Sequence, residues 1–184
     1  MKYTALFRGI NVGGKNIVKM ENLRQLFLDL GVSKVKTYIQ SGNVVFETDL
    51  EETYLQGAIH TGFAERFGFE SHVILRDINE IETLITQIPI TPDEIAAAEA
   101  ADPKVEHLYV CFLDIAPEQS QIDSICREYV GKDMLLAGEK ELYLLCYESI
   151  RNSKMAVYIG KSFPVSTMRN WKTVNKLYGM MTDL

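Results

Sequence analysis

Residues 34–48 read Lys-Val-Lys-Thr-Tyr-Ile-Gln-Ser-Gly-Asn-Val-Val-Phe-Glu-Thr, and this stretch decides the fold of the first half of the chain. Two runs rich in β-branched and aromatic residues lie on either side of Ser41-Gly42, a dipeptide that is typical of turns. The pattern predicts a β-hairpin with strands over residues 34–40 and 43–48.

The segments on either side of this hairpin complete a known order of strands and helices. Apolar residues recur at positions 20, 23, 26, 27 and 30, which predicts a helix that Gly31 ends. A second helix is expected over residues 50–67, and strands are expected over residues 2–8 and 71–76. The resulting order is the split βαβ pattern of ferredoxin-like domains. Both helices would cover one face of an antiparallel sheet, and the face that carries Lys36, Tyr38 and Gln40 would stay uncovered.

The second half of the chain has a similar but less regular order. We expect a helix over residues 78–88, a short alanine-rich helix that begins at Pro92, and a strand over residues 106–114. A helix, two strands and two helices are then expected over residues 117–129, 133–137, 141–147, 154–160 and 169–181. We therefore predict an α+β protein with three parts: a ferredoxin-like lobe over 1–88, a helical linker over 89–103, and a second α+β lobe of related topology over 104–184.

The composition is that of an ordinary globular protein. The 184 residues are 47% hydrophobic and 24% charged, and no apolar run has the length of a membrane span. The first residues lack the pattern of a signal peptide, so we expect a cytoplasmic protein without a membrane partner. The three cysteines and three histidines are scattered. We assign no metal and no cofactor to them.

Charge is distributed unevenly along the chain, whose formal net charge is −6. Residues 1–50 carry a net charge of +3, residues 51–130 carry −12, and residues 131–184 carry +3. The net negative charge argues against non-specific coating of nucleic acid. The two basic ends are still compatible with one anion-binding face, although solvated outer faces of acidic helices in the middle are the favoured explanation.

The loop after the first strand is the first segment that could carry chemistry. Gly9, four further residues, and then Gly14-Lys15-Asn16 approach the phosphate-binding P-loop, but Asn16 stands where that motif needs the hydroxyl of a Ser or Thr. A nucleotide hydrolase is therefore not favoured. Two interpretations stay open. The loop either cradles an anion with its amides and Lys15, or its glycines serve only positive φ angles.

Two further segments complete the candidate site. Ser41 and Asn43 flank the hairpin turn, where they can bind either the backbone or a ligand. Near the C-terminus, Ser166 or Thr167 is expected to cap a helix that places Arg169 in its first turn, where an anion is favoured. The predicted ligand-binding residues are Arg8, Asn11, Gly13, Gly14, Lys15, Asn16, Ser41, Asn43, Arg169, Asn170 and Lys172.

Several of these segments also carry a family resemblance. The stretches over residues 8–14, 19–20, 37–46 and 169–174 resemble the bacterial family known as domain of unknown function 1697. The resemblance spans residues 3 to about 178. It implies a cytoplasmic α+β protein with ferredoxin-like structure, and it implies no activity, cofactor or catalytic residue.

The sequence favours a binding module for a phosphorylated or otherwise anionic small ligand. One alternative is an enzyme of unknown reaction that stabilises an anion through Lys15 and Arg169, because no general base lies within the polar segments. A second is a nucleic-acid-binding protein, which is not favoured because few rings share the sheet face of Tyr38. A third is a homo-oligomeric interaction protein in which basic ends meet an acidic middle. The oligomeric state stays open.

Overall fold

The computed structural model describes residues 1–184, which form a mixed α+β chain with eight strands and seven α-helices. The chain divides into two compact units. The first comprises Met1–Thr83 together with Asn175–Leu184, and the second comprises Leu84–Val174. No helix combines the length and the hydropathy that crossing a membrane requires.

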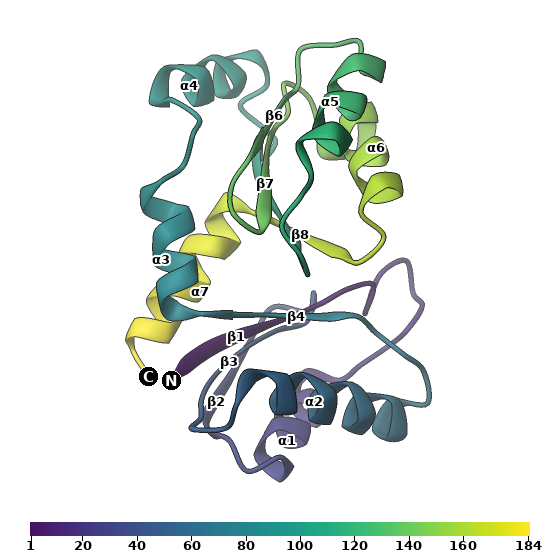
Figure 1. The fold of residues 1–184 in the computed structure, drawn as a ribbon, viewed down its shortest axis with the longest axis vertical. Helices are drawn as coiled ribbons and strands as arrows, with labels where there is room; N and C mark the ends of the chain where they lie inside the picture. The colour runs from purple at the N-terminus through teal and green to yellow at the C-terminus, as the bar shows by residue number, and fades with distance from the viewer. The chain divides into compact units, whose positions relative to one another are not determined.

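The first unit contains one four-stranded antiparallel sheet in the order β2-β3-β1-β4 (Figure 1). Its elements follow in the order β1 (Lys2–Phe7), α1 (Met20–Asp29), β2 (Ser33–Tyr38), β3 (Asn43–Glu47), α2 (Glu52–Phe67), β4 (Val73–Asp77) and α3 (Ile78–Thr86), whose last residues extend into the second unit. This is the ferredoxin-like order predicted from the sequence, with the first and third strands in the centre.

Aromatic packing fills the space between this sheet and helices α1 and α2. The ring of Phe7 stacks on Phe63 at a centroid distance of 5.1 Å and meets the edge of Phe27. Phe27 in turn contacts Phe46, with 5.0 Å between ring centroids. All four rings are fully buried, and aromatic side chains contribute most per residue to such a core. Figure 1 shows both helices on this one face of the sheet.

The opposite face of the sheet is also buried, which corrects the expectation that it stays uncovered. Leu6, Val45 and Ile74 point away from the aromatic core and have at most 3% of their surface exposed. The expectation came from Lys36, Tyr38 and Gln40. They belong to the edge strand β2 and the turn after it, where polar side chains reach water and limit edge-to-edge pairing. The central strands, which carry apolar residues on both faces, determine the burial.

The second unit repeats the topology with a sheet in the order β6-β7-β5-β8. Its elements are α4 (Pro92–Ala101), β5 (Leu108–Leu113), α5 (Gln119–Glu128), β6 (Met134–Ala137), β7 (Glu141–Leu145), the 3-10 turn Ile150–Asn152, α6 (Lys154–Ser162) and β8 (Ser166–Asn170). Helix α7 (Trp171–Thr182) begins in this unit and ends in the first. The core of the second unit lies between its sheet and helices α5 and α6. Leu113, Ile125, Leu142 and Ile159 are among its buried residues.

Strand β8 was missed by the sequence analysis, and the start of the last helix was wrong. Residues 166–170 were assigned partly to a helix capped by Ser166 or Thr167, but they pair with β5 from Tyr109↔Asn170 to Leu113↔Ser166. The helix begins at Trp171, two residues after the predicted start at residue 169, and there the side-chain oxygen of Asn170 accepts a hydrogen bond from the backbone N–H of Thr173 at 2.9 Å. Five residues give a weak strand signal, and the adjacent edge of β5 supplies the missing stabilisation.

Candidate functional site

The glycine-rich segment between β1 and α1, residues 8–19, forms an ordered hairpin that we call the finger. Its tip is the turn Val12-Gly13-Gly14-Lys15, closed by a hydrogen bond of 3.0 Å from Lys15 N–H to the carbonyl oxygen of Val12. The φ angles of Gly13 and Gly14 are 59° and 73°, as a hairpin turn with two left-handed central residues requires. A Cβ at either glycine would meet no atom within 4 Å, so the tip is surrounded by open space.

The side chain of Asn11 holds the finger in shape. Its Nδ2 donates to the carbonyl oxygens of Val18 at 2.9 Å and Gln40 at 2.8 Å, and its Oδ1 accepts from Val18 N–H at 2.8 Å. One amide group thereby joins both arms of the finger to the neighbouring hairpin turn. Asn11 has a φ of 55°, a left-handed conformation that asparagine tolerates better than most residues.

Apolar side chains anchor the base of the finger in the core of the first unit. Ile10 and Val18 are 1% and 2% exposed. Ile10 packs so closely on the hairpin turn that a Cβ at Gly42 would lie 2.6 Å from its Cδ1. The finger is therefore an ordered extension of the domain.

Basic side chains dominate the surface of the finger. Residues 8–19 include Arg8, Lys15 and Lys19 and no acidic residue, whereas the whole chain has a net charge of −6. Lys15 and Lys19 are exposed, and Arg8 is half-buried. Exposed glycine backbone next to lysines offers an anion both N–H donors and positive charge.

The remaining predicted residues of the first unit have structural contacts. The side-chain nitrogen of Asn16 donates to Gly9 O at 3.1 Å. Asn43 is fully buried, and its Nδ2 donates to Tyr38 O and to Ser41 Oγ, both at 3.0 Å. These amides set the shape of the finger and of the hairpin turn. Because these side chains already bind the backbone or a neighbouring side chain, the lysines are the stronger candidates for direct contact with a ligand.

The predicted residues of the second unit lie at the end of β8 and the start of α7. Arg169 is on strand β8 rather than in the first turn of a helix. Its guanidinium donates to Thr167 Oγ1 at 2.7 Å and to Met168 O at 2.9 Å, and burial lowers its pKa to about 10, so it stays charged at neutral pH. Asn170 caps α7, and the Nζ of Lys172 lies 2.6 Å from a carboxylate oxygen of Glu106.

The structure thus brings together Arg8 and the residues of the finger and the hairpin turn within the first unit. It brings together Arg169, Asn170 and Lys172 within the second. A single pocket made from both sets stays a prediction.

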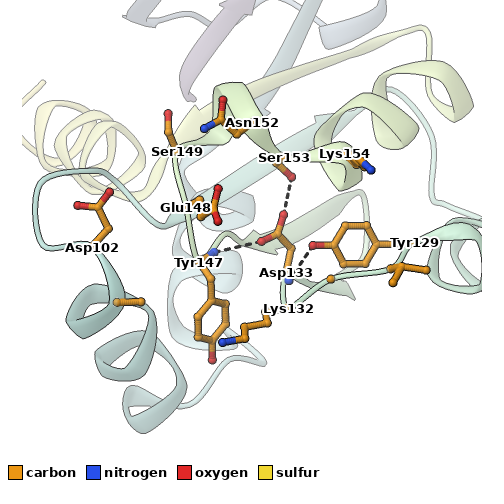
Figure 2. A pocket seen from close by; sticks show the side chains of 13 residues that line it. Asp102, Tyr129, Lys132, Asp133, Tyr147, Glu148, Ser149, Asn152, Ser153 and Lys154 are labelled. Carbon is orange, nitrogen blue, oxygen red and sulfur yellow. Dashed lines mark hydrogen bonds between the residues drawn. The ribbon is translucent and has the colours of Figure 1, made fainter.

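A groove in the second unit escaped the sequence analysis (Figure 2). It has a volume of about 560 Å³, which lies in the range of small-molecule sites. Its lining comes from the end of α4 and from three connecting segments, over residues 129–133, 147–149 and 152–154. No periodic pattern marks these loops. Three residues in the sequence could have indicated the groove. Ser149 and Ser153 cap short helices, and Gly131 lies in a connecting segment.

The carboxylate of Asp133 is fixed within this groove. One of its oxygens accepts from Tyr147 N–H at 3.1 Å, and the other accepts from the hydroxyl of Ser153 at 2.6 Å. Ser153 also caps α6 by accepting from Ala156 N–H. Since the N-terminal end of α6 carries partial positive charge, Asp133 is a favourable anion at this position. Figure 2 shows these bonds converging on Asp133.

The fold and these sites define the protein as a duplicated α+β chain with two ferredoxin-like units and an ordered basic finger on the first. The chain belongs to the family described as protein of unknown function DUF1697, whose model matches residues 1–143. This confirms the family membership that the motifs indicated, and the motif over residues 169–174 lies outside the matched range.

A solved structure shows the same fold. The chain is similar to a conserved bacterial protein from Streptococcus pneumoniae, with 26% sequence identity, a TM-score of 0.75, and 98% of each chain covered. No curated protein matches the sequence.

Proposed function

We propose that this protein is a binding module that recognises a phosphorylated or otherwise anionic small ligand through the finger. The observation that carries the proposal is the comparison of two equivalent connections. The finger takes residues 8–19 to join β1 to α1, whereas residues 114–118 suffice to join β5 to α5 in the same topology. The fold therefore does not require the extra length, the glycines or the lysines of the finger.

The finger offers the chemistry that a phosphate group needs. Lys15 supplies an exposed ammonium group directly after the Gly13-Gly14 turn, and Lys19 and Arg8 add positive charge within the same segment. The clamp made by Asn11 fixes the turn before any ligand arrives, which lowers the entropy lost on binding. Hydrogen bonds between charged groups are about twice as strong as those between neutral groups, so an anion gains most from this surface.

A titration with inorganic phosphate and a panel of phosphorylated metabolites tests the proposal, with backbone NMR shifts of Gly13, Gly14 and Lys15 as the measurement. We expect a saturable shift confined to the finger that weakens as salt is added. The double variant Lys15→Ala, Lys19→Ala is expected to weaken binding about tenfold or more, since two charge-assisted contacts are lost.

Lys161→Ala provides the matched control, because Lys161 is an exposed lysine near the end of α6 in the second unit. It should bind as tightly as the unaltered protein. Equal binding by the double variant and by Lys161→Ala would show that the finger does not recognise the anion.

A further inference from the structure

We propose that the groove of the second unit binds a neutral, polyhydroxylated small molecule of the sugar or cyclitol type. The inference is independent of the finger, since every residue that lines the groove lies between Ala101 and Lys154. It rests on the volume of the groove, on its mixture of hydrogen-bond donors and acceptors, and on its nearly balanced charge.

The groove is lined by side chains that both donate and accept hydrogen bonds. Asp102, Asp133 and Glu148 provide carboxylate acceptors, and Lys132 and Lys154 provide ammonium donors. Ser149 and Asn152 at its edge can do both. A hydroxyl group is the ligand group that uses both kinds of partner at once, because it donates one hydrogen bond and accepts others.

The charge of the lining does not favour an anionic ligand. Three carboxylates face two ammonium groups, so the groove has no surplus of positive charge. At the N-terminal end of α6, where an anion would be most stable, the carboxylate of Asp133 is already in place. A phosphate would lie close to that carboxylate, whereas a neutral hydroxyl could donate to it.

Tyr129 places a further polar group in the groove. Its hydroxyl oxygen accepts a hydrogen bond from Asp133 N–H at 3.0 Å. Burial raises the pKa of Tyr129, so the hydroxyl keeps its proton at neutral pH and can donate that proton to a ligand. A Cβ at position 131 would lie 2.2 Å from this oxygen, so a larger residue there would displace the hydroxyl from its present position.

The rings of Tyr129 and Tyr147 give the groove apolar surface beside these polar groups. Figure 2 shows the two rings on opposite sides of Asp133. Sugar and cyclitol rings present apolar C–H faces between their hydroxyl groups. An aromatic ring flanked by fixed hydrogen-bonding groups matches both parts of such a ligand.

The experiment uses the full chain with glucose and myo-inositol as probes, and inorganic phosphate as the competitor. Saturation-transfer NMR measures the Kd of each probe. We expect saturable binding of at least one polyol that phosphate does not displace. Asn152→Ala and Tyr129→Phe are expected to weaken it about two- to tenfold each, which corresponds to one lost hydrogen bond between neutral groups.

The choice of variants separates the loss of a ligand contact from an effect on folding. Asn152 is exposed at the edge of the groove, so its replacement tests ligand contact with little effect on folding. Tyr54→Phe is the matched control for Tyr129→Phe, because Tyr54 is an exposed tyrosine on α2 of the first unit. No polyol binding by the unaltered protein, equal Kd values in all three variants, or displacement by phosphate would each overturn the inference.

Discussion

The two units of this chain have the same topology but differ in their connecting loops and helix ends. The differences show which features the fold requires and which are additions to it. Each sheet has its first and third strands in the centre and two helices on one face. The first unit has a long connection before its first helix, residues 8–19, which the second unit replaces with residues 114–118. Since the short connection is sufficient, the finger of the first unit is an addition to the fold.

A buried arginine recurs at the same strand position in both units. Arg76 is the fourth residue of β4 and Arg169 is the fourth residue of β8. Each is at most 7% exposed, and each donates to the carbonyl oxygen of the residue before it, at 2.7 Å for Arg76 and 2.9 Å for Arg169. The recurrence favours a structural role for Arg169, whereas the lysines of the finger have no counterpart of this kind.

The helices that cover the sheet of the first unit, α1 and α2, begin differently from those of the second unit. The N-cap residues of α1 and α2 are Lys19 and Glu51, and neither makes a side-chain capping bond. In the second unit, Thr91 forms a capping box at α4, Gln121 Oε1 accepts from Glu118 N–H at 3.1 Å at the start of α5, and Ser153 caps α6. In the first unit only α3 begins with such bonds, since Asp77 Oδ1 accepts from Glu80 N–H at 2.8 Å and Glu80 Oε2 accepts from Asp77 N–H at 2.9 Å.

The largest expected effect comes from the contact between the finger and the hairpin turn of the first unit. Gly42→Ala should lower the free energy of unfolding by about 3 kcal/mol, through a strained φ and a clash with a packed core. Gly42 has a φ of 75°, and an added Cβ would lie 2.6 Å from Ile10 and 2.8 Å from Phe7. Urea denaturation followed by circular dichroism measures the change.

Gly13→Ala is the control for this substitution. It has a similar φ of 59° and open space around it, so only the conformational cost of about 1 kcal/mol should appear. If both variants lost the same stability, the packing between finger and hairpin turn would contribute nothing, and the view of the finger as an anchored extension would fail.

A smaller effect is expected at the capping box of the second unit. Thr91→Ala should destabilise α4 by about 1 kcal/mol, because the threonine hydroxyl accepts from Glu94 N–H at 3.3 Å. Amide hydrogen exchange over residues 92–101 is the measurement. Faster exchange spread evenly over both units would contradict a local role.

The same capping box predicts a dependence on pH. Hydrogen bonds from the backbone N–H and the hydroxyl of Thr91 hold the pKa of Glu94 below its usual value. The stabilisation by Glu94 is therefore fully present above the pKa it has in the unfolded chain, and it is lost as the pH falls through its lower folded pKa. Protection of the α4 amides, relative to their intrinsic exchange rate at each pH, should fall at that acidic pH in the unaltered protein and change less in Thr91→Ala.

The smallest effect is expected from adding to α2 the kind of serine cap that α6 has. Glu51→Ser should stabilise α2 by about 0.5 to 1 kcal/mol, since a serine at the N-cap can accept from the third amide of the helix and the present residue makes no such bond. A shift in the urea midpoint measures the gain. A loss of stability would show that the charge of Glu51 at the helix N-terminus outweighs the hydroxyl.

The sequence predicted most elements because their patterns are local. The hairpin at Ser41-Gly42 and the apolar period of α1 depend on neighbours within a few residues, and both agree with the structure to within two residues at each end. Strand β8 was missed because its five residues give a weak strand signal by themselves and depend on pairing with the distant strand β5. The start of the last helix was placed wrongly for the same reason.

The candidate sites show the same difference between features that depend on local sequence and features that depend on distant contacts. The basic and glycine-rich character of residues 8–19 can be read directly from the chain, and so can the Gly13-Gly14 turn. The role of Asn11 could not be predicted, because it depends on the carbonyl of Gln40, which folding brings close. The groove around Asp133 was missed altogether, since its lining comes from separate segments with no shared pattern.

The amino-acid sequence by itself determined the α+β class, the ferredoxin-like order of the first half and the basic character of the finger, because side-chain period, turn residues and charge act over short distances. Only the tertiary structure decided that the second half forms a second four-stranded sheet of the same topology, that Arg169 is a buried strand residue, and that separate connecting segments line a groove. These features depend on contacts between residues distant in the chain, and their geometry arises when the core packs.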